Sequence, residues 1–145
     1  MKKVMIIILG ISLFAEADFS RNDSKGIVTD SITGLQWQDY YGPNNPGIRR
    51  TLWKNAVDYC NDLVLGGYSD WRLPNINELG TIISFGKRNP SISNQFVYIN
   101  EHGYWSSTNA AMYEYPKSAW LIFFGSGSQQ YREKDDRHYV RCVRG

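Results

Sequence analysis

The sequence predicts an α+β domain with two helices, a twisted antiparallel sheet, long loops and one disulfide. In two stretches of the first half, apolar residues recur at three- and four-residue steps, which is the spacing of one helix face. The second half holds short runs rich in aromatic and β-branched residues between turn residues, as is typical of strands. Helices and strands segregated in this way favour the α+β class.

Residues 1–17 have the features of a signal peptide. Two lysines precede an apolar run from Val4 to Phe14, and Ala15-Glu16-Ala17 matches the small-x-small pattern that signal peptidase accepts. The alternative is an uncleaved membrane anchor. A membrane helix needs about 20 apolar residues, and this run is shorter, which favours a cleaved signal peptide. We expect an exported protein (periplasmic, on the cell surface or secreted) with a single domain over residues 18–145 and no membrane span after cleavage.

The charge balance argues against a nucleic-acid binder. The chain has 16 basic and 14 acidic residues, and removing two lysines and one glutamate with the signal peptide leaves a net charge of +1. A nucleic-acid-binding domain is normally strongly basic. The remaining length of about 128 residues is enough for one domain and too short for two.

The first part of the expected domain is strand and loop. Residues 18–26 are polar and are expected to form a frayed arm. Ile27 to Thr29 and Leu35 to Gln38 have the composition of two short strands separated by a turn. Tyr40 to Arg50 contains two prolines and two glycines and is expected to be a loop.

The first helix is predicted over Thr51 to Leu65, with Thr51 as its N-cap and Gly66-Gly67 as its stop. Its apolar face is formed by Trp53, Ala56, Val57, Cys60, Leu63 and Val64.

The second helix is predicted from Ile76 to about Phe85. Asn75 is its expected N-cap, and Glu78 can return the hydrogen bond in a capping box. A loop follows from Gly86 to Asn94.

Four strands are predicted in the second half: Tyr104 to Thr108, Ala119 to Phe124, Gln129 to Glu133 and His138 to Val143. The tight connection between the second and third predicts a hairpin. Alternation in the last strand places His138, Val140 and Cys142 on the inward face, and Tyr139, Arg141 and Val143 on the other.

Cys60 and Cys142 are the two cysteines of the chain. In an exported protein an even pair favours a disulfide. Closing a loop of about 82 residues would destabilise the unfolded chain by roughly 4–5 kcal/mol in the loop-entropy treatment.

Several motifs in order resemble the C-terminal domain family of Legionella collagen-like proteins. They are Thr33-Gly34-Leu35-Gln36-Trp37-Gln38, Gly67-Tyr68-Ser69-Asp70-Trp71-Arg72-Leu73-Pro74, Tyr104-Trp105-Ser106-Ser107-Thr108, Ala119-Trp120 and Tyr139-Val140-Arg141-Cys142-Val143-Arg144. The resemblance implies a C-type-lectin-like fold with a disulfide from the first helix to the final strand. It also implies an adhesin-like role, because the best-known members are bacterial surface adhesins implicated in binding sulfated host glycans. The chain departs from these adhesins because it has no Gly-x-y collagen stalk.

Candidate ligand-binding residues are basic groups and loop tyrosines. Arginine matches the planar oxygens of sulfate and carboxylate, and two basic groups on one face would make an anion site. The expected partner is a sulfated or acidic glycan or a surface protein, and a solvated charged surface is the alternative. The candidates are Arg49, Arg50, Lys54, Arg132, Arg137, Arg141, Tyr40, Tyr41 and Tyr113.

The sequence predicts no catalytic residue, metal or cofactor. The calcium motifs of sugar-binding C-type lectins are absent, and Glu133, Asp135 and Asp136 alone do not provide the six to eight oxygens that calcium takes. The segment Asp70 to Pro74 is expected to serve packing, with Arg72 paired to Asp70 or Glu78. The alternative to a glycan-binding domain is a structural or protein-interaction subunit of a surface or periplasmic assembly.

Overall fold

The computed structural model describes residues 18–43, 49–111 and 117–145, and within them the chain forms two helices and nine strands. The α+β class is confirmed. The predicted signal peptide lies outside the described residues. The elements are β1 Phe19–Asn22, β2 Ile27–Asp30, β3 Gln36–Gln38, β4 Arg50–Thr51, α1 Trp53–Asn61, α2 Ile76–Thr81, β5 Gly103–Asn109, β6 Ser118–Phe123, β7 Ser128–Glu133, β8 His138–Tyr139 and β9 Val143–Arg144.

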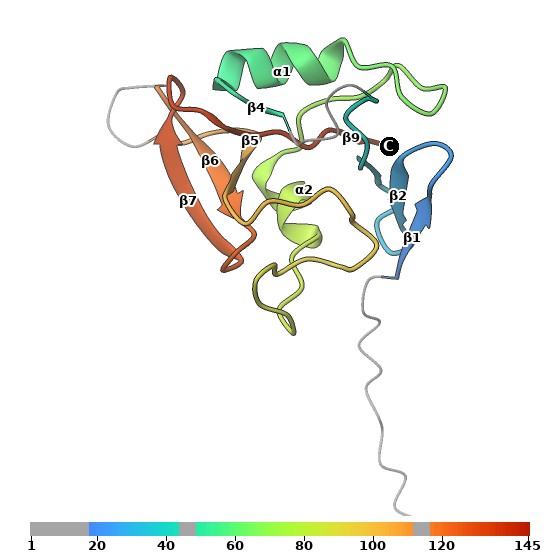
Figure 1. The fold of residues 1–145 in the computed structure, drawn as a ribbon. Helices are drawn as coiled ribbons and strands as arrows, with labels where there is room; N and C mark the ends of the chain where they lie inside the picture. The colour runs from blue at the N-terminus through green and yellow to red at the C-terminus, as the bar shows by residue number, and fades with distance from the viewer. Residues whose placement is uncertain (1–17, 44–48, 112–116) are drawn as a thin grey trace, which may run out of the picture.

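The strands form two sheets rather than the single antiparallel sheet expected (Figure 1). The smaller sheet has the order β1-β2-β3-β9 and the larger one β4-β8-β5-β6-β7. Neighbours are antiparallel except β5 and β8, which pair in parallel. The predicted hairpin is confirmed as β6 and β7, paired from Ser118 with Glu133 to Phe123 with Ser128.

The larger sheet has one helix on each face. Trp105 and Leu121 share a buried cluster with Cys60 of α1. Tyr104 and Ile122, one residue along each strand, share a second buried cluster with residues of α2. The two-residue period of a strand therefore supplies both cores from the same strands.

The first helix is shorter than predicted. Its N-cap is Leu52, which makes no side-chain capping bond, and Thr51 lies in β4 instead. Thr51 is paired with His138 of β8, so strand pairing takes the place of the expected cap; its carbonyl also accepts a hydrogen bond from Trp105 Nε1 at 3.0 Å. The helix ends at Asn61, and Gly66-Gly67 forms a separate turn with φ of 63° and 85°.

The second helix begins as predicted and ends early. Asn75 Oδ1 accepts from Glu78 N at 2.8 Å, and Glu78 Oε1 accepts from Asn75 N at 2.9 Å, which confirms the capping box. The helix stops at Thr81 rather than near Phe85, because Ile83 leaves it to bridge Ile92.

The expectation of a frayed arm over residues 18–26 was wrong. Phe19 to Asn22 pair with β2 along their whole length, and the Phe19 ring packs edge-on against Phe96 with centroids 5.6 Å apart. The side chains there are mostly polar and the strand is held by backbone pairing, so the sequence carries no apolar pattern that would predict it.

The predicted last strand is divided between the two sheets. His138 and Tyr139 form β8 in the larger sheet, and Val143 and Arg144 form β9 in the smaller one. The alternation of faces expected between them fails, because the connecting residues Val140, Arg141 and Cys142 are all fully buried.

The predicted disulfide is confirmed. Cys60 of α1 is bonded to Cys142 with a Cα–Cα distance of 5.4 Å and a sequence separation of 82 residues. Among the described residues, no helix has the length and apolar character needed to cross a membrane.

Candidate ligand-binding surface

The structure brings together cations from two distant parts of the chain. Pairing of β4 with β8 sets Arg50 opposite Tyr139, and Arg50 Nε donates to the carbonyl of Arg137 at 3.0 Å. Two residues beyond β4, the Trp53 N–H donates to the carbonyl of Lys134 at 3.1 Å. We call the surface formed by Arg50, Arg132, Lys134 and Arg137 the basic surface.

An aromatic side chain forms one side of the basic surface. Lys134 Nζ lies 4.0 Å from the centroid of the Trp53 ring, within the range of a cation–π interaction, and donates to Asn109 Oδ1 at 2.7 Å. The indole is fixed because its Nε1 donates to the carbonyl of Ser106 at 2.8 Å. Sequence analysis placed Trp53 only on the buried helix face, yet it is half-buried and reaches the surface.

The cations of this surface differ in how many contacts their side chains make with other protein groups. Arg132 Nη2 donates to Gln130 Oε1 at 2.6 Å and its guanidinium lies over the Phe123 ring. Arg50 and Arg137 are exposed, and the Arg137 side chain makes no hydrogen bond or ion pair with any residue that the structure describes. These two are the arginines best placed to bind an external anion. Asp135 and Asp136 in the same turn reduce the local charge.

His138 lies beneath this surface, half-buried, where the neutral form of its ring is favoured. Burial lowers its pKa from the ordinary value of 6.5; Asp136 acts in the opposite direction, and Arg132 and Arg50 lower the pKa further. The ring packs edge-on against Trp105 with centroids 4.7 Å apart. We therefore assign His138 to packing.

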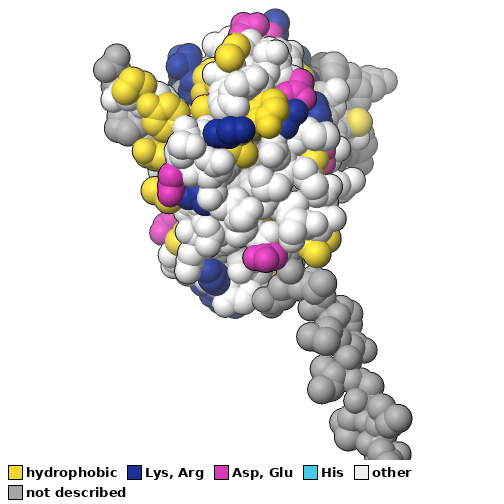
Figure 2. All heavy atoms as spheres, turned by 90° about the vertical axis from the view of Figure 1, so that its right-hand side faces the viewer, with side chains coloured by type: hydrophobic (Ala, Val, Ile, Leu, Met, Phe, Trp, Pro, Cys, Tyr) yellow, Lys and Arg dark blue, Asp and Glu magenta, His cyan; other side chains and the backbone are white. Residues whose placement is uncertain are grey.

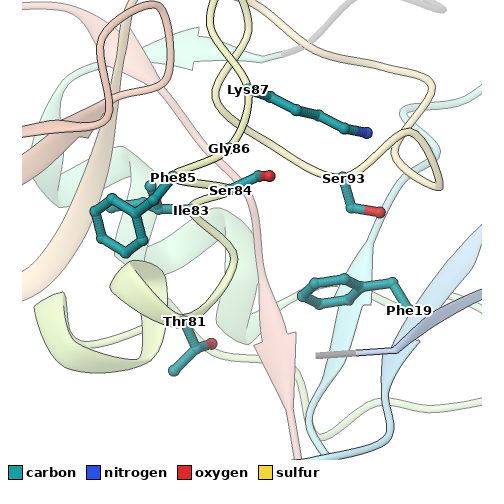
Figure 3. Close-up of a pocket in the computed structure, with 8 residues that line it drawn as sticks. All are labelled: Phe19, Thr81, Ile83, Ser84, Phe85, Gly86, Lys87 and Ser93. Carbon is teal, nitrogen blue, oxygen red and sulfur yellow. The ribbon is translucent and has the colours of Figure 1, made fainter. Parts of the chain in front are cut away.

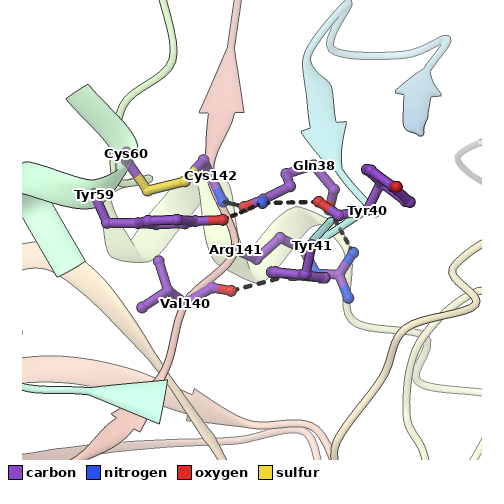
Figure 4. Close-up of a disulfide and its surroundings, with 8 residues drawn as sticks. All are labelled: Gln38, Tyr40, Tyr41, Tyr59, Cys60, Val140, Arg141 and Cys142. Atoms are coloured by element: carbon purple, nitrogen blue, oxygen red, sulfur yellow. Dashed lines mark hydrogen bonds between the residues drawn. A yellow bond between two sulfur atoms is a disulfide. The ribbon is translucent and has the colours of Figure 1, made fainter. Parts of the chain in front are cut away.

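Arg141 was expected in the anion site, and the structure corrects this. Its side chain is fully buried, and Nη1 donates to Asp39 Oδ1 and to the carbonyl of Gln38, both at 2.7 Å. Its other terminal nitrogen donates to the carbonyl of Tyr98. Figure 4 shows this guanidinium beside Tyr41. An arginine already paired inside the protein cannot reach a ligand at the surface.

Arg49 and Lys54 point to other partners. The Arg49 guanidinium lies 5.3 Å from the Tyr59 ring centroid, and Lys54 Nζ pairs with Asp58 at 2.9 Å along α1. They flank Arg50 and Trp53 in sequence, but none of these contacts joins them to the basic surface.

The loop tyrosines are packed more than expected. Tyr40 and Tyr41 are both half-buried and meet the Tyr98 ring edge-on, with centroids 6.5 and 6.1 Å away. The Tyr41 hydroxyl donates to the carbonyl of Val140 at 3.1 Å, and burial raises its pKa well above the ordinary value. The third candidate, Tyr113, lies outside the described residues.

The segment Asp70 to Pro74 serves packing, as expected. Trp71 and Leu73 are buried, and Arg72 forms a two-bond pair with Glu78 at 2.7 and 2.6 Å. This hydrogen-bonded pairing lowers the pKa of Glu78. Asp70 pairs instead with Arg144.

A second face of the molecule carries charges of both signs. Figure 2 shows basic and acidic side chains interspersed over it, with uncharged surface between them. In the described ranges, no three His, Cys, Asp or Glu side chains gather closely enough to hold a metal ion.

Sequence analysis missed two hollows beside the segment after α2. Ser84, Phe85 and Lys87 line both. Their one signal in the sequence is Phe85, a phenylalanine followed by glycine and two cations at the end of an apolar pattern.

Comparison with protein families matches residues 26–144 to the Lcl C-terminal domain. A comparison with curated proteins gave no match.

Proposed function

The chain belongs to the Lcl C-terminal domain family, and from this membership we propose that it is an exported, non-catalytic binding domain of C-type-lectin-like fold that recognises an anionic glycan. Residues 1–17 would direct export and be removed, leaving one domain over residues 18–145. The glycan would be bound at the basic surface.

The proposed fold assignment is supported by the connection between the ends of the domain. A disulfide links the first helix to the segment before the final strand, and that strand pairs with β3 near the start of the chain. The segment from Ile83 to Asn100, which follows α2, contains only one isolated bridge and is the long loop region of such a fold.

The observation that carries the proposed function is the approach of Arg50 to Arg137. These residues are 87 positions apart and are joined through one hydrogen bond, with Lys134 and Trp53 beside them. Sulfate and carboxylate groups each present oxygens that one guanidinium can bind with two parallel hydrogen bonds. Two exposed arginines on adjacent segments suit a polymer that carries repeated acidic groups.

The proposed lack of catalysis rests on the surroundings of the side chains that could act as a nucleophile or a base. Both cysteines are in the disulfide, and His138, the histidine near the basic surface, is packed against Trp105. An acid–base or nucleophilic mechanism needs a base within hydrogen-bond reach of a reacting group.

Heparin chromatography tests the proposed function. Wild-type protein should be retained at physiological salt, and the R50A/R137A variant should elute at lower salt because two arginine contacts with sulfate or carboxylate groups are lost. R49A/K54A is the matched control, since it removes the same charge outside the basic surface. Wild-type protein in the void volume, or equal loss of retention in both variants, would exclude the proposed site.

A second candidate is a subunit of a surface or periplasmic assembly. It is favoured by two large apolar side chains that face solvent, Val64 at 73% and Phe85 at 88% exposure. Light scattering of the wild type and of V64S/F85S separates the candidates: a concentration-dependent oligomer lost in the variant supports a subunit role.

A further inference from the structure

Strand β7, residues Ser128–Glu133, forms one edge of the larger sheet. Figure 1 shows it as the outermost strand, with β6 on its inner side. In the part of the chain that the structure describes it is the longest strand at a sheet edge, since β1, β4 and β9 have four, two and two residues. An edge strand carries backbone N–H and C=O groups that can pair with a further strand.

The backbone of β7 directs the polar groups of alternate residues away from the sheet. Lys134, one residue beyond β7, donates its N–H to the carbonyl of Lys117 at 2.7 Å. The register of β6 and β7, continued by one residue, sets these two directly opposite each other as a hydrogen-bonded pair. Such pairs alternate along an antiparallel ladder. Gln129, Tyr131 and Glu133 therefore turn their N–H and C=O groups outward, and the residues between them bond to β6.

This edge lacks the features that usually prevent strand pairing. The ladder is unbroken along both strands, and β7 contains no proline. Two outward carbonyls have a partner already: that of Tyr131 accepts from Arg132 Nη1 at 2.8 Å, and that of Glu133 accepts from the Asp136 N–H. A carbonyl oxygen has two lone pairs, so each can accept a second hydrogen bond. The N–H groups of Gln129 and Tyr131 make no hydrogen bond with any residue in the described ranges.

We propose that β7 pairs antiparallel with β7 of a second copy of this chain, with Tyr131 on the two-fold axis. The two larger sheets then become continuous, and the contact is closed because both copies use the same residues. In this register Glu133 lies opposite Gln129 of the other copy, and Arg132 lies opposite Gln130. Each charged side chain of the strand therefore meets a neutral one.

Charge and ring contacts select this register. An axis at Arg132 or Glu133 would set that residue opposite its own copy, and like charges directly opposite each other destabilise a strand pair. An axis nearer the start of β7 would separate the two Tyr131 rings. With the axis at Tyr131 the rings lie together, and aromatic cross-strand pairs stabilise a sheet. Tyr131 is 44% exposed in the single copy, so this contact covers ring surface that water now meets.

The hollow of about 430 Å³ beside the segment after α2 lacks a comparable arrangement. In Figure 3 the Ser84 and Ser93 hydroxyls and the Lys87 amine border its space, while the Phe85 ring turns away from it. Its polar and apolar groups therefore do not converge on one ligand. The edge of β7 instead presents donors and acceptors in one line, at the spacing of a second strand.

Sedimentation velocity of the purified wild-type protein tests the pairing. The mass should rise with concentration from one copy to two and no further, because the contact is closed. Hydrogen exchange should slow at residues 129–133 over the same concentration range and stay unchanged in β1. The R50A/R137A variant should dimerise like the wild type, since the pairing does not rest on the proposed function. A monomer at every concentration, or a dimer without protection of β7, would overturn the proposal.

Variants of the edge locate the contact. Tyr131→Lys sets two like charges at the axis and should raise the dissociation constant at least about tenfold. Gln129→Pro removes an outward N–H without removing a bond to β6, and should also weaken the dimer.

Val64→Lys is the matched control. It adds the same charge at a 73% exposed apolar side chain in the segment after α1, which lies far from β7 in Figure 1, and should leave the dimer unchanged. Circular dichroism checks that each variant is folded. A folded Tyr131→Lys variant that dimerises like the wild type, or an equal loss in Val64→Lys, would contradict pairing through β7.

Discussion

Asp39 and Arg141 form an ion pair in which neither side chain is exposed to solvent, with Nη1 and Oδ1 2.7 Å apart. The Asp39 carboxylate also accepts hydrogen bonds from the backbone N–H of Val97 at 2.7 Å and of Tyr98 at 3.2 Å. Arg21 of β1 contacts its second oxygen. One buried carboxylate thus joins the start of the domain, the long loop and the segment before β9.

Replacing Asp39 with Asn should destabilise the domain by about 3–5 kcal/mol, because Arg141 would keep its charge inside the protein with no counter-charge. Urea unfolding followed by tryptophan fluorescence measures the difference. The control is Asp70→Asn, which breaks the more exposed pair with Arg144 and should cost far less, because solvent screens that pair. Similar losses in the two variants would show that burial of the Asp39–Arg141 pair does not increase its contribution to the free energy of unfolding.

Removal of the disulfide should have an effect of comparable size. The C60S/C142S variant frees an 82-residue loop in the unfolded chain and should lose about 4–5 kcal/mol of stability. Guanidinium unfolding of the variant and of the oxidised wild type gives the comparison. A loss below about 1 kcal/mol would mean that the unfolded chain is already restricted without the bond.

The capping box of α2 can be tested by removing one hydrogen-bond acceptor. Asn75→Ala removes the acceptor for the Glu78 N–H and should cost about 1 kcal/mol. Asn77→Ala, an exposed position two residues further along the same helix, should be nearly neutral. Differential scanning calorimetry resolves the two, and equal melting temperatures would contradict the role of the cap.

Acidification should weaken the domain through His138. Its folded pKa lies below the ordinary 6.5, so the folded state favours the neutral ring. The stability that this ring contributes is complete above pH 6.5 and is lost as the pH falls through the lowered value. Thermal unfolding at pH 7.5 and 5.5 should show a larger drop for the wild type than for His138→Gln. The carboxyls of Asp70 and Glu78, whose pKa values are also lowered, titrate below this range.

Sequence patterns predicted the parts of the fold that rest on local chemistry. The capping residues of α2 and the β6–β7 hairpin follow from spacing and turn residues alone. The two-residue strands β4 and β8 are too short to carry a pattern. The sequence therefore predicted an anion site only on the condition that two basic groups share a face, and it did not predict the pairing that brings Arg50 to Arg137. Sequence alone left open whether those groups would meet.

Arg141 shows why part of the candidate site was predicted wrongly. Strand alternation assigns it to the face opposite Cys142, and an arginine is normally exposed. The chain crosses from one sheet to the other at this point, so neighbouring side chains are all buried and the alternation no longer applies. The acid that makes this burial possible, Asp39, lies 102 positions away.

The position of β9 determines when the domain can form during synthesis. Arg141, Cys142 and Val143 complete the buried ion pair, the disulfide and the four-stranded sheet, so a nascent chain that stops short of them lacks all three. Residues up to Val143 therefore have to leave the ribosome before the native state of this domain becomes stable. Under the proposed export, late folding would keep the chain unfolded during passage through a secretion channel, and the disulfide would form in the compartment where thiols are oxidised.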